Sequence, residues 1–198
     1  MKTVTVQLYQ LDELSDSAKK NARDWFKEQG YPVGDWFQGF FDYATGLATF
    51  FGMEIDRISF SGFWSQGDGA SFVGVFRPED MRTLEELKTE LGDTSIHDTV
   101  TVLFKRFQAV KHPDHALIKI VRHESRYVHS GTLDVEDEDG GYELDELHEL
   151  RSCMRSFADW IYRMLDDEYS ELCSDEEVDE ELRAGEYWFM VDGTPDPT

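Results

Sequence analysis

The sequence predicts an α+β fold in which an antiparallel sheet, built from hairpins, is covered by helices, one of them long and C-terminal. Side chains alternate at a period of two over 58–64, 70–76 and 126–135, and an apolar run precedes the last of these at 116–121, a pattern typical of β-hairpins. Elsewhere, above all over 144–172, apolar residues recur three or four positions apart, and this spacing predicts amphipathic helices. The strands come in pairs and do not alternate singly with helices, so the class is α+β.

The N-terminal segment predicts a strand followed by a helix. Apolar residues alternate with polar ones over Lys2–Leu8, so this stretch is expected to form a half-buried first strand. Ser15 is placed to cap a helix that Gly30 and Pro32 should end, because neither residue continues a helix well.

The next segment, Asp35–Phe51, is apolar nearly all round. It is shorter than the roughly 20 residues that a membrane span needs, and it contains Gln38 and Asp42. A buried core helix is therefore the prediction. Gly39 and Gly46 are expected to let this helix lie close to the hairpin, and Asp42 is expected to face solvent at the helix edge.

Two strand-like runs, Ile58–Trp64 and Ala70–Phe76, flank a glycine-rich loop. In this loop Gly67 and Gly69 can adopt positive φ, and Asp68 can accept hydrogen bonds from its own loop backbone. Turn chemistry of this kind is one interpretation. The other is that exposed loop amides form a concavity for phosphate or another anion. Neither a lysine nor a helix follows, so the phosphate-loop pattern is absent.

The remaining elements follow from the same two periods. One helix is predicted over 78–91, and a cap near Asp93 or Ser95 begins another that runs through Phe107. Strands over 116–121 and 126–135 form the second hairpin. The long helix follows over 144–172, where one apolar stripe recurs at alternating steps of three and four residues.

The C-terminal residues predict a short acidic helix and a last strand. Ser174 begins a capping box, Gly185 ends the helix, and Tyr187–Val191 is expected to be extended. The length favours one domain, over 1–193, with a flexible tail over 194–198.

Composition narrows the class of protein. Its 42 acidic and 19 basic residues give a formal charge of −23, and the resulting field repels nucleic acid and anionic membrane surfaces. We therefore expect no direct nucleic acid binding and no membrane association. Cys153 and Cys173 are too few for a disulfide framework or a four-cysteine zinc site, and the start lacks a secretion signal, so a cytoplasmic location is expected. The protein should be a monomer or a homodimer.

One segment, Lys105–His129, reverses the charge balance. Six lysines and arginines face two acidic residues there, and the preferred interpretation is that they pair with the protein's own acidic face. A ligand phosphate is the alternative. His112 and His115 are close in sequence, but Pro113 leaves no helix to align both rings, so no metal site and no cofactor are predicted.

Two stretches carry a resemblance to known proteins. Ser61–Phe72, with the sequence SGFWSQGDGASF, and Leu14–Lys19 together resemble a loosely related group of uncharacterised proteins encoded by tailed bacteriophages. The resemblance covers about the first 80 positions. It implies a phage origin, a shared hairpin and, for the location, the host cytoplasm, and it transfers no catalytic residues.

The excess charge is concentrated near the C-terminus, where residues 134–186 hold 21 acidic and four basic side chains. The first hypothesis is therefore an acidic interaction protein, a nucleic-acid mimic that occupies the groove of a basic, nucleic-acid-binding host protein, such as a defence or DNA-processing protein. A merely solvated helix face is the alternative for each residue. The candidate contacts are Asp145, Glu146, Glu149, Asp159, Asp166, Asp167, Glu168, Glu171, Asp175, Glu176, Glu177, Asp179 and Glu180.

The second hypothesis is a binding protein for a small ligand, such as a nucleotide messenger, that uses the glycine-rich hairpin loop. Aromatic stacking and arginine suffice physically for such a site. The candidate residues are Trp64, Ser65, Gln66, Gly67, Asp68, Gly69, Ser71, Arg122 and Arg126. No catalytic residues are predicted, since the sequence has no nucleophile elbow, metal-ligand helix or phosphate loop.

Overall fold

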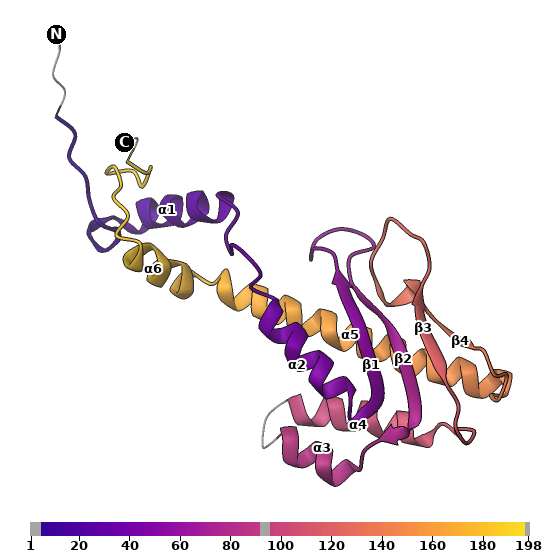
Figure 1. Ribbon diagram of the computed structural model, residues 1–198. Coiled ribbons are helices and arrows are strands. Elements are labelled where there is room, and N and C mark those ends of the chain that lie inside the picture. The colour runs from indigo at the N-terminus through magenta and orange to yellow at the C-terminus, as the bar shows by residue number, and fades with distance from the viewer. Residues whose placement is uncertain (1–4, 92–95, 197–198) are drawn as a thin grey trace. The chain divides into compact units, whose positions relative to one another are not determined.

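The computed structural model describes residues 5–91 and 96–196 and confirms the α+β class (Figure 1). The chain divides into two compact units. Unit 1 consists of the described residues up to Trp36 and from Asp167 onward, and unit 2 of Phe37–Asp166. The prediction of one domain over 1–193 concerns both units together and stays a prediction. The α-helices are α1 (Asp16–Glu28), α2 (Gln38–Ala48), α3 (Leu84–Leu91), α4 (Ile96–Ala109), α5 (Leu144–Leu172) and α6 (Asp175–Ala184).

The sheet belongs to unit 2 and is antiparallel throughout. Its strands are β1 (Phe51–Phe60), β2 (Ala70–Met81), β3 (Ile118–Arg122) and β4 (Leu133–Asp137), and they lie in the order β1-β2-β3-β4. Both predicted hairpin pairings, β1 with β2 and β3 with β4, are confirmed.

The first hairpin has a longer loop than the sequence predicts. Phe60 pairs with Ala70, so residues 61–64, expected in the strand, lie in the loop. The reason is local: one carboxylate oxygen of Asp68 accepts the N–H groups of Trp64 and Ser65, at 3.0 and 2.6 Å. Those two amides are therefore turned into the loop and away from the strand ladder.

The first strand also carries a bulge. Ile55 pairs with Gly74 and Arg57 with Val73, which leaves Asp56 as an extra residue. The bulge shifts the alternation of buried and exposed side chains along β1. Glycine is required in the facing strand, because a Cβ on Gly74 would lie 2.1 Å from the carbonyl oxygen of Glu54.

An aromatic core fills the space between the sheet and its helices. The Phe51 ring lies 5.1 to 5.2 Å, centre to centre, from the rings of Phe104, Phe107 and Phe157, and all four side chains are fully buried. Phe72 packs on Phe157 from the second strand. Helices α4 and α5 therefore cover one face of the sheet. The apolar stripe of α5 faces this core, and the helix has the predicted bounds.

Helix α2 is a correction to the sequence analysis, since it is shorter than the predicted Asp35–Phe51 and only half-buried. Its last turn packs inward, but Tyr43 is 39% exposed, and a Cβ on Gly39 or Gly46 would meet no atom within 4 Å. The two glycines thus do not mediate a close approach to the hairpin. Asp42 is exposed as expected and accepts a hydrogen bond from Gln38.

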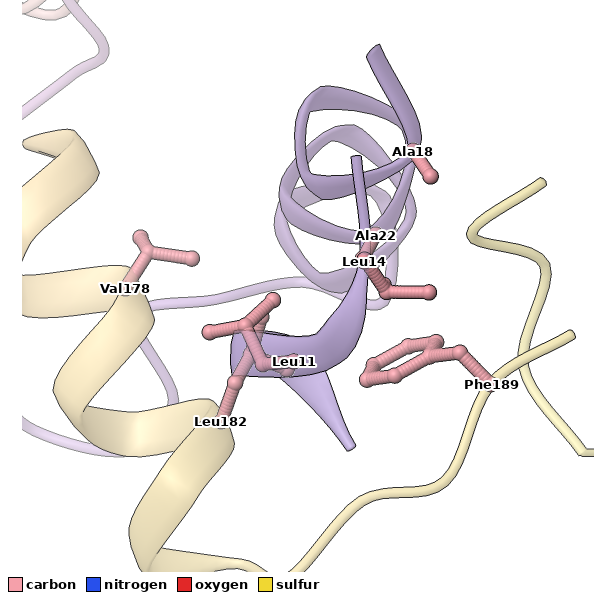
Figure 2. Close-up of a cluster of buried hydrophobic side chains, with 7 residues drawn as sticks. All are labelled: Leu11, Leu14, Ala18, Ala22, Val178, Leu182 and Phe189. Carbon is pink, nitrogen blue, oxygen red and sulfur yellow. The ribbon is translucent and has the colours of Figure 1, made fainter. Parts of the chain in front are cut away.

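Unit 1 has its own small core. Helix α1 and the short 3-10 helix before it, Leu11–Glu13, pack there on α6 and the C-terminal segment (Figure 2). Ser15 and Ser174 cap α1 and α6 as predicted, accepting the N–H groups of Ala18 and Glu177 at 3.4 and 3.2 Å. The buried side chains of this core are Leu11, Leu14, Ala18, Ala22, Val178, Leu182 and Phe189.

The two strands predicted at the ends of the chain are wrong for the described residues. Residues 5–8 have no regular structure, and the pairing between the two ends is reduced to one bridge between Tyr9 and Phe189, with N···O distances of 2.8 and 2.9 Å. Phe189 forms a second isolated bridge with Pro195. The rest of the predicted Lys2–Leu8 strand lies outside the described residues. Along the predicted tail, the amide of Asp196 donates to the carbonyl of Trp188, so this part is hydrogen-bonded.

Two interior bounds also differ from prediction, and the cap predicted near Asp93 or Ser95 lies outside the described residues. The helix expected from residue 78 begins at Leu84, because β2 continues to Met81. The strand expected from residue 126 begins at Leu133, after a turn of 3-10 helix over Ser130–Thr132.

Over the described residues, no helix is both long and apolar enough to cross a membrane.

Candidate functional site

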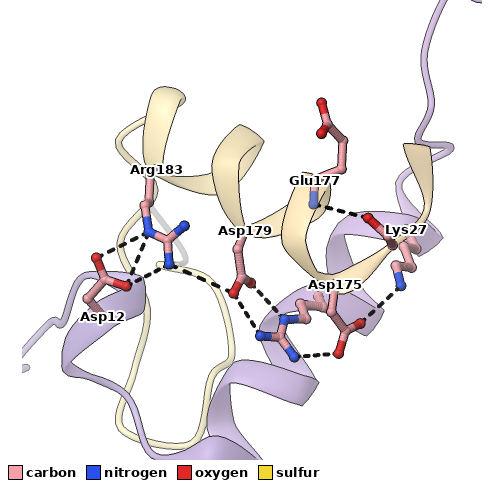
Figure 3. Close-up of polar contacts among 8 residues, drawn as sticks. Asp12, Lys27, Asp175, Glu177, Asp179 and Arg183 are labelled. Atoms are coloured by element: carbon pink, nitrogen blue, oxygen red, sulfur yellow. Dashed lines mark hydrogen bonds and ion pairs between the residues drawn. The ribbon is translucent and has the colours of Figure 1, made fainter. Parts of the chain in front are cut away.

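Two of the candidate carboxylates on α6 hold α6 to α1. Arg23 donates to both carboxylate oxygens of Asp179, each at 2.7 Å, and its remaining terminal nitrogen donates to Asp175, also at 2.7 Å (Figure 3). Asp179 is only 8% exposed, and the hydrogen bonds from Arg23 lower its pKa. Such a bidentate, desolvated pair is structural, so these two carboxylates are not free for a partner.

Two other cations of this region are engaged as well. Lys27 lies 3.6 Å from Asp175, and Arg183 donates to Asp12 at 2.9 Å (Figure 3). The hydrogen bond from Arg183 lowers the pKa of the Asp12 carboxyl. These pairs join segments that are far apart in the chain.

The first half of α5 shows the same behaviour in unit 2. Glu149 lies 3.1 Å from Arg106 of α4, and Glu146 lies 3.7 Å from Lys111. A third pair joins Lys119 to Glu138 at 2.5 Å. The expectation that the basic segment Lys105–His129 pairs with the protein's own acidic face is thus confirmed at these three cations.

Nine of the thirteen candidate carboxylates take part in no ion pair within the described part of the chain. Two of them, Asp145 and Asp159, stand apart on α5, and the other seven fall within residues 166–180. Eight of the nine are exposed, and Glu177 is half-buried. Within unit 1 we define the acidic surface as Asp167, Glu168, Glu171, Glu176, Glu177 and Glu180.

The acidic surface places like charges next to one another. Helix α5 carries Asp167 and Glu171 four residues apart, and α6 carries Glu176 and Glu180 at the same spacing. The two residues of each pair are therefore about 6 Å apart along the helix axis. Such pairs destabilise a helix by about 0.2–0.5 kcal/mol each. The acidic surface therefore destabilises the folded protein slightly. Its carboxylates are available to bind a cationic partner.

The hairpin loop of the alternative hypothesis packs against the segment before β4. A Cβ on Gly67 would lie 2.5 Å from the Tyr127 ring, and one on Gly69 would lie 2.6 Å from the Cβ of His129. Arg126 stacks over Tyr127, 4.6 Å from the ring centre. The structure thus brings the loop and Arg126 into one region, through contacts that the sequence did not predict.

The loop candidates have different environments. Trp64 is 79% exposed, whereas Ser71 is fully buried in β2, with its hydroxyl outside any hydrogen bond among the described residues. The amides of Trp64 and Ser65 already donate to Asp68, so they do not form an open anion concavity. Gln66 is exposed in the loop, and Arg122 ends β3.

His112, one of the two histidines considered for metal, is half-buried and has a structural environment. Its Nδ1 lies 2.8 Å from the Tyr142 hydroxyl, and its Nε2 lies 3.0 Å from the Phe107 carbonyl oxygen. Burial lowers the pKa of His112 and raises that of Tyr142. Within the described residues, no three His, Cys, Asp or Glu side chains are grouped to hold a metal ion.

The sequence analysis missed a polar stripe on α5. Arg151 and Arg155 lie one helical turn apart beside Ser152, and together with Ser130 and Gly131 they border a hollow of about 550 Å³. The signal was present, since the polar residues recur three and four positions apart alongside the apolar stripe. The prediction for this helix rested on its apolar stripe and its carboxylates and did not include the polar stripe.

Comparison with known proteins gives one match. Residues 36–175 match the family model of a domain of unknown function, DUF8835, while the search of curated proteins and of solved structures finds no match. The matched residues include all of unit 2 and all of α5, whereas α1 and nearly all of α6 lie outside them. Because the match covers more than half of the chain, the protein belongs to the DUF8835 family.

Proposed function

We propose that this protein is an interaction protein, whose acidic surface binds the basic, nucleic-acid-binding surface of another protein. One observation carries the proposal. The cations Arg23, Lys27 and Arg183 are engaged by Asp12, Asp175 and Asp179, and the six carboxylates of the acidic surface stay outside every ion pair of the described residues.

Charge density supports the same conclusion. Unit 1 holds 18 acidic and six basic residues over 68 positions, a net charge of −12. Fixed carboxylates on helices offer a cationic groove what duplex phosphates offer, a dense series of negative charges. The proposed activity is nucleic-acid mimicry, in which the protein competes with nucleic acid for its partner.

The resemblance to bacteriophage proteins specifies the partner within this proposal. A phage-encoded mimic is useful when it blocks a host protein that acts on phage nucleic acid. The proposed partner is therefore a host defence or DNA-processing protein with a basic groove.

A capture experiment from bacterial lysate tests the proposal with two variants of equal charge. The surface variant carries Glu168→Gln, Glu171→Gln, Glu176→Gln and Glu180→Gln. The control variant carries Asp56→Asn, Glu79→Gln, Asp80→Asn and Glu85→Gln, four exposed carboxylates of unit 2. Both variants lose four negative charges.

We expect wild type and the control variant to retain the same basic protein at low salt and to release it steeply as salt rises. The surface variant should retain at least tenfold less. Equal loss in both variants would show that net charge alone is responsible, and it would overturn the proposed surface.

A second candidate function, nucleotide binding at the hairpin loop, is favoured by one observation, the packing of Tyr127 on Gly67 with Arg126 over the Tyr127 ring. Under this alternative Trp64 stacks on the base and Arg126 binds the phosphate. A nucleotide that binds should raise the melting temperature of the wild type, and Trp64→Ala should abolish the rise. An unchanged melting temperature with each of the common nucleotides would remove this candidate.

A further inference from the structure

The polar stripe of α5 lines a groove in unit 2. Its six members recur at spacings of three and four residues, so they form one row on the helix surface. The turn of Ser130 and Gly131 lines the hollow beside this row, and Arg106 of α4, which is not among the lining residues, donates to two of its hydroxyls. We call this hollow the α5 groove, and its row consists of His148, Arg151, Ser152, Arg155, Ser156 and Asp159.

Arg155 has no carboxylate partner in the described part of the chain. Its Nε and Nη2 donate to the Leu133 carbonyl at 3.0 and 2.8 Å, and Nη2 also reaches the Gly131 carbonyl at 3.3 Å. These bonds fix the side chain and leave its positive charge without a counter-charge.

Arg151 is held by an ion pair and keeps its terminal donors. Its Nε lies 2.5 Å from Asp134 but forms no hydrogen bond with described residues, and Asp134 accepts a hydrogen bond from His123 at 2.9 Å. The Nη groups of Arg151 and the Nη1 group of Arg155 form no hydrogen bond with described residues. Two arginines four residues apart on a helix repel each other, and Asp134 offsets the charge of Arg151 alone.

Arg106 holds two hydroxyls of the groove in place. Arg106 donates to the Ser152 hydroxyl at 3.1 Å and to the Ser156 hydroxyl at 3.0 Å. Ser152 accepts this bond, so its own O–H remains available to donate into the groove. Glu149 balances the charge of Arg106 at 3.1 Å, and Asp159 lies at the end of the row.

We infer that the α5 groove binds a phosphate-bearing small molecule, whose phosphate lies between Arg151 and Arg155 and accepts a hydrogen bond from Ser152. The number of donors decides between phosphate and carboxylate. The two guanidinium groups and the hydroxyl offer more donors than the two oxygens of a planar carboxylate can accept, and a tetrahedral phosphate presents three or more oxygens. No residue of this site belongs to the acidic surface or to the loop candidates.

Titration with inorganic phosphate, followed by two-dimensional NMR, tests the inference on the whole chain. Ionic strength is held constant with chloride, so that screening does not change. We expect saturable shifts confined to the amides of residues 130–131 and 148–159 and to the arginine side-chain signals. At ten times the dissociation constant, phosphate should also raise the melting temperature by roughly 3–6 °C.

Variants locate the site. Arg151→Gln should weaken phosphate binding at least tenfold, whereas Arg163→Gln, an equal charge change on an exposed residue of the same helix outside the groove, should leave it within twofold. Arg155→Lys keeps the charge and removes the planar fork, so it should also weaken binding if the protein stays folded. Trp64→Ala should have no effect, which separates this site from the hairpin loop.

Three outcomes would overturn the inference. The first is that the shifts do not saturate, and the second is that Arg163→Gln weakens binding as much as Arg151→Gln; either would show that phosphate only screens the charges of the protein. The third is that acetate at equal ionic strength binds as tightly as phosphate, which would show that the groove accepts a carboxylate, such as a side chain of a second copy.

Discussion

The two compact units carry nearly the same net charge on very different lengths of chain. Unit 1 has a net charge of −12 over 68 residues, and unit 2 has a net charge of −11 over 130. In unit 2, Arg106 and Lys111 pair with glutamates of α5 that stand beside a large aromatic core. In unit 1, a small core is reinforced by Arg23 and Arg183, and the remaining carboxylates of α6 stay exposed except Glu177, which is half-buried.

This difference distinguishes carboxylates that stabilise the fold through ion pairs from carboxylates that are available to a partner. Carboxylates that look alike in sequence have different roles, and the role depends on whether a cation from another element lies over them. Asp179 and Glu180 are neighbours, yet the first is 8% exposed and paired, and the second is exposed.

The largest expected effect separates the two cores. Phe51→Ala should destabilise unit 2 by about 3–5 kcal/mol, because it removes a fully buried ring that contacts three others. Hydrogen exchange should show lost protection in β1, β2 and α4. Phe189→Ala is the matched change in unit 1, where amides of α1 and α6 should lose protection. If each change affected both units equally, the division into two units would not describe their stability.

The second effect concerns the pairing that distinguishes Asp179 from its neighbour. Asp179→Asn should lower the free energy of unfolding by about 3 kcal/mol, since it leaves the part-buried Arg23 without its bidentate partner. Glu180→Gln, the control, should change it by less than about 0.5 kcal/mol. Denaturant unfolding at neutral pH measures both, and equal effects would contradict the assignment of Asp179 as structural.

Acid adds an independent check on the same residue. Arg23 lowers the pKa of Asp179 in the folded state, so the stability from this pair is present above pH 3.8 and is lost as pH falls further. The loss of stability below pH 3.8 should therefore be shallower in Asp179→Asn than in the wild type. A parallel pH dependence in the two proteins would contradict the pairing.

The third effect is a pH dependence in unit 2. Burial lowers the pKa of His112 below its ordinary 6.5, so the unfolded chain takes up a proton first. Stability from this group is complete above pH 6.5 and falls as pH drops toward the folded pKa, by at most about 1.4 kcal/mol per pH unit. His112→Gln should reduce that slope, and hydrogen exchange of the Phe107 region should report it. A slope identical to wild type would show that His112 titrates normally.

The smallest effect on stability belongs to the acidic surface. Glu176→Gln with Glu180→Gln removes a like-charge pair of α6 and should stabilise the protein by a few tenths of a kcal/mol. Thermal unfolding at low salt measures the gain, which should vanish at high salt. A loss of stability would show that these glutamates have structural partners.

Local patterns predicted much of the fold, because they depend on neighbours in the chain. The spacing over 144–172 gave the bounds of α5, and Ser15 and Ser174 gave two helix starts. The loop of the first hairpin could not be bounded in this way, because it depends on which amides Asp68 accepts. Helix α2 was predicted as buried from apolar content alone, although burial depends on how many elements surround it.

The candidate site was predictable only as a set of residue types. Arg23 and Asp179 are 156 positions apart, and no local pattern shows that one neutralises the other. The sequence pattern therefore predicted the same role, contact with a partner, for Asp175, Asp179, Glu176 and Glu180. It contains nothing that distinguishes the paired carboxylates from the others.

The most direct test of the central claim is competition between duplex DNA and this protein for the captured partner. The acidic surface is proposed to occupy the groove in which DNA binds, so increasing duplex DNA at fixed salt should release the partner completely, with a midpoint that falls for the surface variant and not for the control variant. A partner that binds DNA and this protein simultaneously, or that responds identically to both variants, would contradict the account.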